Sequence, residues 1–445
     1  MELDAYRELV GRHRVEILEA ERWLWRHPET GYREWETQGY LAGVFEAAGY
    51  TLRYAGDIPG FYAELDTGRP GPRVLIMGEM DALLVPGHPE SVDGRVHACG
   101  HNAQCAALIG AALAFREPGA LDGLCGSIRL MAVPAEEMIE LEYREELRRR
   151  GVIKYYGGKT EFLRRGYMDG CDIAFLNHVR TGVGYPRFDF NDSNGFMTKT
   201  ITFKGRAAHA GGSPHKGVNA LYSASLALSA INALRETFRD EEHIRVHPIM
   251  TEGGSTVNSI PARAVLSTYV RGATLEAIEE TSRKVNRAAA AGALALGAGA
   301  EICDRPGYSP LLNDPGLKEA AREIMSGLVG AENVVELPWG AGSTDMGDLS
   351  CVMRTLHPHV SGASGHAHGD DFRITDPETC CVLSAAAEVM LAASLLSDGA
   401  ARARRILSGS PPRYADKEAY FAAIDRFIAD RELVSYREDG AEIAF

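Results

Sequence analysis

The sequence has no excess of basic residues. Across 445 residues, 61 Asp and Glu outnumber 47 Lys and Arg, giving a formal net charge of −14 at neutral pH. A nucleic-acid-binding protein needs a basic surface to contact phosphates, so this charge argues against that class. The excess of acidic residues is explained by solubility, since a net charge keeps protein molecules apart in solution. We therefore expect a small-molecule substrate and no nucleic-acid partner.

Paired cysteines and long apolar runs are also scarce. The eight cysteines are scattered, and the only close pair, Cys380–Cys381, is adjacent and poorly placed for a metal knuckle. A disulfide framework is not expected in a chain large enough to bury a core. The longest apolar tract that we identify, around Ala288–Ala300, is shorter than the ~18–20 residues that span a bilayer. The acidic Met1–Asp4 is unlike a signal peptide. We expect a cytoplasmic protein without a membrane partner.

The chain is long enough for more than one domain, because single cores stop growing at roughly 250–300 residues. Two apolar runs, Ser127–Val133 and Asp172–Asn177, are typical of buried parallel strands of an α/β domain. Residues 196–205, in contrast, alternate like a strand with one solvated face. Further elements are expected as a helix at 218–234, strands at 247–252 and 264–271, a helix at 275–296 and a strand at 301–304. This order is a split βαβ unit, which predicts a small α+β domain.

These patterns predict a discontinuous catalytic domain at residues 1–194 and 306–445, interrupted by an inserted domain at 195–305. We expect one helix at 4–26, ended by the proline and glycine of His27-Pro28-Glu29-Thr30-Gly31. The tail from Ser408 begins with a Ser-Gly-Ser-Pro-Pro linker, and a charged helix is expected after it.

The sharpest chemical signal is Cys99-Gly100-His101, in which the glycine allows the two flanking side chains to converge. Thiolate and imidazole are good ligands for a borderline metal such as zinc. A second signal is the pair Glu136-Glu137, directly after the strand at 127–133. Adjacent side chains point apart, so one carboxylate can bind a metal while the other faces its water as a general base. Strand ends are where open α/β sheets place their sites.

Two weaker signals contain histidine. His178 follows the strand at 172–177, although a lone histidine there is more often structural than a ligand. The loop Ser364–Phe372 offers His366 and His368. Together with the cysteine and the glutamates, these histidines predict a metal site assembled from loops at several strand ends of one domain.

Seven segments, in order over about residues 20–395, resemble the M20 metallopeptidase/amidohydrolase family, specifically its D branch. They are His27–Gly31, Gly78–Leu83, His97–Asn102, Pro134–Glu137, Gly205–Ala210, Val257–Pro261 and Gly342–Gly347. The Cys-Gly-His-Asn and Ser-Thr-Asp-Met-Gly forms are most similar to aminobenzoyl-glutamate hydrolases and β-alanyl-lysine-type dipeptidases. The resemblance implies a mixed, mostly parallel sheet of the zinc-peptidase type. It also implies that the inserted domain is a ferredoxin-like lid that forms a homodimer or a higher homo-oligomer.

The resemblance also implies a role for each matching residue. The metal ligands would be Cys99, which bridges, together with His101, Glu137, His178 and His368. We prefer His368 to His366 because the local family pattern His-x-x-x-Phe fits His368–Phe372. One or two divalent ions would bind, Mn²⁺ or Zn²⁺, although Co²⁺ or Ni²⁺ also suit such donors.

Five further residues match catalytic or supporting positions of the family. Glu136 matches the general base, and Asp81 matches a carboxylate that steadies a metal ligand or its neighbour. His209 matches a lid histidine that reaches the site of a partner subunit and stabilises the oxyanion. Asn258 matches a lid residue that holds the substrate. Asp345 either contacts the substrate or maintains its loop.

The expected activity is hydrolysis of a C–N bond by metal-activated water. The amide of an N-acyl or aminobenzoyl amino acid, or of a dipeptide, is the leading substrate. Residues 138–159 replace a short glycine-rich loop of the family, and Glu79 stands where many relatives have Asp. These departures leave open hydrolytic deamination of an activated aromatic amine such as 5-nitroanthranilate. A metal-binding scaffold without catalysis is the remaining alternative.

Overall fold

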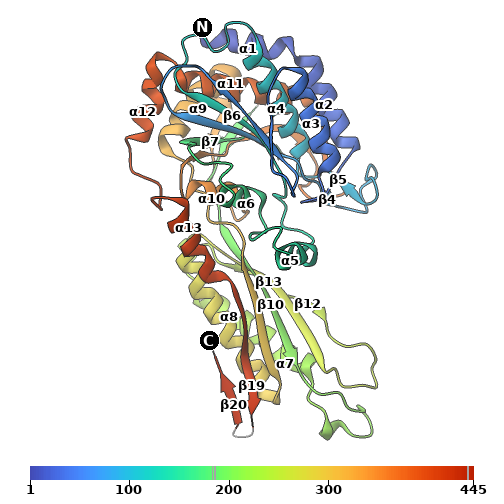
Figure 1. Ribbon diagram of the computed structural model, residues 1–445. Helices are drawn as coiled ribbons and strands as arrows, with labels where there is room; N and C mark the ends of the chain where they lie inside the picture. The colour runs from blue at the N-terminus through green and yellow to red at the C-terminus, as the bar shows by residue number, and fades with distance from the viewer. Residues whose placement is uncertain (183, 185–186, 438–439, 445) are drawn as a thin grey trace. The chain divides into compact units, whose positions relative to one another are not determined.

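The computed structural model describes residues 1–182, 184, 187–437 and 440–444, which form two compact units (Figure 1). Unit 1 comprises Met1–Asp192, Leu312–Pro338 and Asp345–Lys417. Unit 2 comprises Ser193–Leu311, Trp339–Thr344 and Glu418–Phe445.

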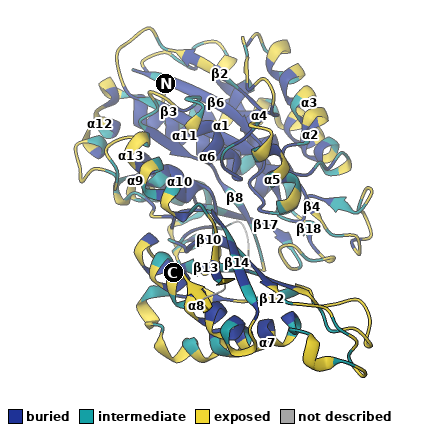
Figure 2. Cartoon of the chain, turned by 60° about the horizontal axis from the view of Figure 1, so that its bottom comes forward, coloured by how far each residue is buried: buried dark blue, intermediate teal, exposed yellow. Residues whose placement is uncertain are grey.

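A six-stranded sheet in the order β1-β2-β6-β3-β7-β16 forms the centre of unit 1. Its strands are β1 (Arg53–Tyr54), β2 (Phe61–Asp66), β3 (Arg73–Glu79), β6 (Ser127–Val133), β7 (Ile173–Phe175) and β16 (Arg354–Leu356). Strands β6, β3, β7 and β16 run parallel, whereas β2 is antiparallel to both β1 and β6. The two predicted parallel strands are therefore confirmed. Their apolar side chains are buried because helices cover the sheet (Figure 2).

Helices pack on this sheet, either directly or through another helix. Those of the N-terminal and C-terminal parts are α1 (Leu3–Arg12), α2 (Arg14–Arg26), α3 (Trp35–Ala47), α4 (His101–Arg116), α9 (Pro315–Val329), α11 (Ser384–Leu396) and α12 (Ala401–Leu407). Three others are α5 (Leu141–Arg149), α6 (Gly158–Arg164) and α10 (Met346–Ser350). α4 packs on β3 and β6, while α6 and α10 lie on the opposite side of the sheet (Figure 1). The prediction of one helix at 4–26 is wrong, because the structure has two helices there. Non-helical backbone at His13 separates α1 from α2.

One helical segment, Glu378–Leu396, is long and apolar enough to cross a membrane by length and composition alone. It starts with a π-helical part, Glu378–Leu383, and continues as α11. This tract is longer than the one around Ala288–Ala300, which corrects the sequence analysis. Its apolar window is 89% buried inside the protein, as in the core helix of a globular fold.

A second sheet of unit 1 has the order β15-β9-β17-β18, with β8 also paired to β17. Its strands are β8 (His178–Thr181), β9 (Phe188–Phe190), β15 (Val334–Glu336), β17 (His359–Ser364) and β18 (Arg373–Ile374). A small two-stranded ladder joins β4 (Leu83–Leu84) to β5 (Arg95–Val96). Short 3₁₀ turns occur at Pro214–Lys216, Leu234–Thr237, Asp240–Glu242, Ala331–Asn333, Asp398–Ala400 and Asp425–Phe427.

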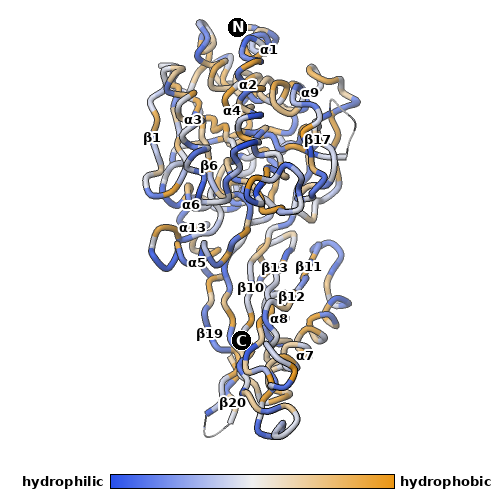
Figure 3. Tube along the Cα trace, turned by 90° about the vertical axis from the view of Figure 1, so that its right-hand side faces the viewer, coloured by the Kyte–Doolittle hydropathy of each residue, from blue (hydrophilic) through white to orange (hydrophobic). Residues whose placement is uncertain are grey.

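The inserted part of unit 2, residues 193–311, is an antiparallel sheet with two α-helices packed on it, in the predicted β-α-β-β-α-β order. Its first elements are β10 (Gly195–Lys204), α7 (Ala220–Ala233), β11 (Arg245–Val246), β12 (Ile249–Glu252), β13 (Arg263–Gly272), α8 (Leu275–Leu296) and β14 (Gly299–Pro306). β13 lies between β10 and the short strands β11 and β12, and α7 and α8 pack together on the sheet. The hydrophobic stretches of α7 are visible in Figure 3. The ferredoxin-like inserted domain is confirmed.

The end of the chain corrects the predicted domain division, which placed all of residues 306–445 in the catalytic domain. After α13 (Lys417–Ile424), the chain forms β19 (Ala429–Arg437) and β20 (Gly440–Ile443) rather than a charged helix alone. β19 pairs with β14 and β20 pairs with β19, so both strands extend the sheet of unit 2. The physical reason is that β14 offers unpaired backbone groups along its free edge, which a sequence pattern does not reveal.

Candidate metal centre

The predicted ligands gather at the carboxyl ends of the parallel strands of unit 1. Glu79 is the last residue of β3, and Asp81 lies two residues beyond it. Glu136 and Glu137 follow β6, and His178 begins β8 shortly after β7. Parallel strands bring their carboxyl ends to the same edge of a sheet, which places these segments together.

Among the residues that the structure describes, four groups of donor atoms converge there, each with all its atoms within 4.8 Å of one another. The groups are Cys99/His101/His178, Cys99/Glu137/His368, His101/Glu136/Glu137 and Glu79/Glu136/Asp345. Cys99 Sγ lies 3.4 Å from His178 Nε2, and His368 Nε2 lies 3.2 Å from Glu137 Oε1. Cys99 belongs to two of the groups, as a residue shared between two ions would. All five ligands proposed from the sequence are therefore neighbours.

The turn that presents Cys99 and His101 requires its glycine. Gly100 has a φ of +83°, and a Cβ on it would lie 2.8 Å from the side chain of Val179. Only glycine adopts this backbone at low cost in so small a space. Cys99 precedes the turn, while His101 is the first residue of α4.

Asp81 holds two of the proposed ligands at once. His101 Nδ1 lies 2.9 Å from the Asp81 carbonyl oxygen and 3.1 Å from Asp81 Oδ1. Asp81 Oδ2 accepts a 2.7 Å hydrogen bond from the backbone N–H of Glu137. Because Nδ1 faces two acceptors, it carries the proton in the neutral ring, and Nε2 presents a lone pair. The geometry thus supports a positioning role for Asp81.

Glu136 lies in surroundings that suit proton transfer. Burial, followed by the negative charges of Glu79 and Glu137, raises the pKa of Glu136 well above its usual range. The residue before it, Ala135, has a φ of +57°, and its N–H donates to Glu34 Oε1 at 2.8 Å. A carboxyl group whose pKa is closer to neutrality can both accept and return a proton.

The two histidines of the 364–372 loop have different partners. His366 is 87% exposed and lies 2.8 Å from Asp371. His368, in contrast, contacts Glu137, and this hydrogen bond raises the pKa of His368. Of these two histidines, His368 belongs to a donor group that contains Cys99, whereas His366 belongs to none of the groups found among the described residues.

The donor atoms fit divalent cations. Glu79 Oε2 and His101 Nε2 are buried and make no hydrogen bond among the described residues. Burial, followed by the charge of Glu137, raises the pKa of the Cys99 thiol well above its usual range. A bound cation would satisfy the buried acceptors and stabilise the thiolate, since ligands of this kind must be deprotonated.

The sequence analysis missed a buried cation beside these donors. The Lys159 side chain is fully buried, and its ammonium contacts Glu79 Oε1 closely and Asp345 Oδ1 at 2.5 Å. The Lys159 N–H also donates to Asp345 Oδ2 at 2.9 Å. Asp345 therefore holds a lysine, which favours the loop-holding role over substrate contact. The available signals were the unusual Glu79 and the unusual segment that ends in Lys159.

A second basic residue of the 138–159 segment holds the backbone around Glu136. Arg144 is 1% exposed. Its guanidinium donates to the carbonyl oxygens of Glu137, of Tyr156 at 2.6 Å and of Ala135 at 3.4 Å. The segment is therefore part of the wall that positions the two glutamates.

His209 and Asn258 belong to unit 2 and not to the donor cluster of unit 1. They are neighbours there, since the Ala210 N–H donates to the Asn258 carbonyl at 2.9 Å. His209 is exposed, and its Nδ1 accepts hydrogen bonds from the backbone of Gly211 and Gly212. The exposed Nε2 side of the ring is thus oriented by the loop.

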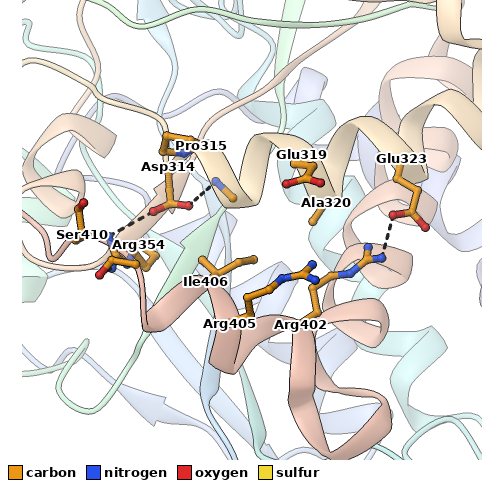
Figure 4. A pocket seen from close by; sticks show the side chains of 12 residues that line it. Asp314, Pro315, Glu319, Ala320, Glu323, Arg354, Arg402, Arg405, Ile406 and Ser410 are labelled. Carbon is orange, nitrogen blue, oxygen red and sulfur yellow. Dashed lines mark hydrogen bonds and ion pairs between the residues drawn. The ribbon is translucent and has the colours of Figure 1, made fainter.

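A separate hollow of about 420 Å³ in unit 1 contains none of the predicted site residues (Figure 4). Acidic and basic side chains along its lining already pair with each other. Arg354 lies 3.3 Å from Asp314, and Arg402 lies 2.8 Å from Glu323. Four of its charged side chains thus have partners within the protein.

Comparisons with known proteins agree with this fold. Residues 191–295 match the model of the peptidase dimerisation domain M20_dimer. Indole-3-acetyl-aspartic acid hydrolase of Enterobacter agglomerans is 30% identical over 337 residues, which are 72% of this chain and 71% of that protein. One of the subunits of p-aminobenzoyl-glutamate hydrolase from Escherichia coli is 30% identical over 289 residues, which are 61% of this chain and 54% of that protein. The Bacillus subtilis protein YXEP, a dinuclear metal-binding peptidase of the M20 family, has a TM-score of 0.66 at 21% identity, covering 88% of this chain and 99% of that one.

The fold, the donor cluster and these relatives define a metal-dependent hydrolase acting on C–N bonds, and not a scaffold without catalysis. The chain belongs to the M20 family.

Proposed function

We propose that this hydrolase cleaves the amide of an N-acyl or aminobenzoyl amino acid, or of a dipeptide. The observation that carries the proposal is the convergence of Cys99, His101, Glu137, His178 and His368 around a buried Glu136. The relatives named above act on amides of an aromatic acyl group with an acidic amino acid, as their names state. We therefore expect this chain to act on a substrate of the same class.

The proposed mechanism divides the work among the residues of the chain. A bound divalent cation would supply Lewis acidity, lowering the pKa of water and polarising the scissile carbonyl. Glu136 takes the proton of the attacking water and returns it to the leaving nitrogen. Asp81 fixes the ring of His101 and the backbone of Glu137. His209 stabilises the oxyanion, and Asn258 holds the substrate.

We propose two ions of Mn²⁺ or Zn²⁺, because Cys99 belongs to two donor groups and the related YXEP protein is dinuclear. Carboxylate donors also suit Mn²⁺ and Co²⁺, while the thiolate favours Zn²⁺. The eight free cysteines support our further proposal that the protein works in the reducing cytoplasm.

We also propose that unit 2 mediates a homodimer. α7 exposes Tyr222 (62%) and Leu226 (45%), and the neighbouring part of unit 2 exposes Ile249 (53%) and Val257. Large exposed apolar side chains of this kind mark protein–protein contacts. The match to a dimerisation domain supports the same surface.

The decisive experiment is a hydrolysis screen with Mn²⁺- or Zn²⁺-loaded enzyme, followed by mass spectrometry. The panel contains N-acyl amino acids, p-aminobenzoyl-glutamate, β-alanyl dipeptides and substituted anthranilates. We expect turnover of an amide, and a Glu136→Gln variant that loses about 10²–10⁴-fold in kcat while keeping its metal.

The matched control is Glu146→Gln, which alters a 64% exposed glutamate on α5 and should leave kcat unchanged. Hydrolysis by Glu136→Gln at the wild-type rate would refute the mechanism. Turnover of anthranilates alone would replace the amide by hydrolytic deamination of an aryl amine.

A further inference from the structure

The two carboxylate oxygens of Glu79 have different surroundings. Glu79 is fully buried at the end of β3, and its Oε1 is held by the ammonium of Lys159. Its Oε2 points the other way and lies 3.1 Å from His101 Nε2. Glu79 Oε2 and His101 Nε2 are both buried and make no hydrogen bond within the described part of the chain.

This close approach does not have the geometry of a hydrogen bond. The 3.1 Å separation of Glu79 Oε2 and His101 Nε2 is short enough for one, but the two atoms are not aligned for it. The Nδ1 side of the same ring is held by the oxygens of Asp81, which fixes the direction in which Nε2 points. A cation bound by both atoms would satisfy a buried carboxylate oxygen and a buried imidazole nitrogen together.

The separation also fits two ligands of one ion. Nitrogen and carboxylate donors lie about 2.0–2.2 Å from a zinc ion, so neighbouring donor atoms of one ion come roughly 3–3.5 Å apart. His101 Nε2 is already the donor atom that the proposed metal site needs. Glu79 Oε2 therefore stands where a further ligand of the same ion would stand.

The charges of the site point to the same conclusion. Five buried carboxyl groups surround it, and they are Glu79, Asp81, Glu136, Glu137 and Asp345. The Lys159 ammonium pairs with two of them. The same ammonium lies beside the Glu79/Glu136/Asp345 group. The Lys159 side chain therefore supplies the positive charge that these three carboxyl groups need. The other oxygen of Glu79, Oε2, faces His101 in the ligand cluster.

We propose that Glu79 is an additional metal ligand through Oε2, and that Lys159 is the positioning residue that holds its Oε1. The proposal rests on the metal site of the proposed function. A glutamate can bridge an ammonium and a metal ion with its two oxygens. An aspartate at the same backbone position is one methylene shorter and cannot reach both.

The test measures metal binding and not activity. Wild type, Glu79→Gln and Glu79→Asp are titrated with Mn²⁺ alone against a competing chelator, and metal content is measured by mass spectrometry. Both variants should lose at least ~10-fold in affinity for one ion, the size of effect seen when even supporting residues of a metal site are removed. With Co²⁺, the visible absorption spectrum should change in both variants, because the set of ligands changes.

Lys159→Met supplies the second measurement. If Lys159 acts by holding Glu79, Lys159→Met should lower Mn²⁺ affinity, and Glu79→Gln should have a smaller effect in that background than in the wild type. Glu79→Asp keeps the negative charge, so the test remains possible if Glu79→Gln does not fold. Thermal melts establish that each variant is folded. Glu146→Gln, on an exposed side chain, is the control that should leave affinity and spectrum unchanged.

Unchanged affinity and an unchanged Co²⁺ spectrum in both Glu79 variants would overturn the proposal while leaving the proposed function intact. A wild-type protein that binds neither Mn²⁺ nor Co²⁺ would overturn both.

Discussion

At the residue scale, the same chemical group has different properties in different surroundings. Although burial alone would raise the pKa of both carboxyls, the pKa of Glu137 is lowered by His368, whereas that of Glu136 is raised further by its negative neighbours. The two residues are adjacent in the sequence. Their separate roles as ligand and base therefore follow from the partners that each side chain meets.

Glu388 is not one of the donor residues, and it shows what burial does to the pKa of a carboxyl group. Burial in α11 raises its pKa to about 8, although its Oε1 accepts a hydrogen bond from the Asn177 N–H. In the unfolded chain, a glutamate ionises near 4.5. Between these values the folded protein keeps a proton that the unfolded chain releases, so stability falls as pH rises through this range.

We expect Glu388→Gln to raise the melting temperature of the metal-free protein at pH 8 relative to wild type, but not at pH 5. The difference in unfolding free energy should grow by up to ~1.4 kcal/mol per pH unit between the two pKa values. Thermal melts of both proteins from pH 5 to 8 measure it. A difference that is independent of pH would contradict the assigned shift, and Glu146→Gln should show no such trend.

At the element scale, the charged 138–159 segment directly follows the base and the ligand in the sequence, which predicts that it reshapes the mouth of the pocket. That role stays a prediction. The structure buries two of its basic side chains, Arg144 and Lys159, against the backbone and carboxylates of the site. On α5, Glu146 and Arg149 are exposed although Arg144 is buried, so charge density alone does not identify the buried face of the helix.

Arg144→Met should therefore destabilise unit 1 and lower kcat. The carbonyl oxygens of Ala135, Glu137 and Tyr156 would lose their donor, which costs roughly 2–4 kcal/mol in total. Urea or thermal unfolding measures the loss. Arg149→Met changes a 75% exposed arginine on the same helix and should stay within ~0.5 kcal/mol of wild type. Equal effects of the two substitutions would show that Arg144 does not hold this loop.

At the scale of the whole molecule, the dimer is proposed to complete the active site. His209 is exposed in unit 2, and its loop orients the ring. The family resemblance implies that this histidine serves the site of the partner subunit. Such an arrangement makes each site depend on two chains.

We expect inactive Glu136→Gln and inactive His209→Asn proteins to regain activity when they are co-expressed or mixed and allowed to exchange subunits. A mixed dimer has one site with both residues intact, because Glu136 of one subunit meets His209 of the other. If His209 acted within its own subunit, both sites of the mixed dimer would stay inactive. Activity of the mixture, measured with the amide found in the screen, separates these outcomes.

Much of the fold and the metal-ligand set can be predicted from the sequence. The buried strand at Ser127–Val133 and the helix at Leu275–Leu296 have the predicted bounds, since hydrophobic period and end signals act locally. The resemblance to the M20 family selects Cys99, His101, Glu137, His178 and His368 as ligands, and the structure brings their donor atoms together.

Only the tertiary structure reveals the rest, because it depends on contacts between distant segments. Lys159 meets Asp345 and Glu79 across 186 and 80 residues, and no local pattern encodes that burial. β19 adds to β14 because the edge of that strand is free after the chain has folded. The sequence by itself determined the kinds of donor and the order of the elements. The fold decided which charges are buried together, since burial and pairing exist only once the chain is compact.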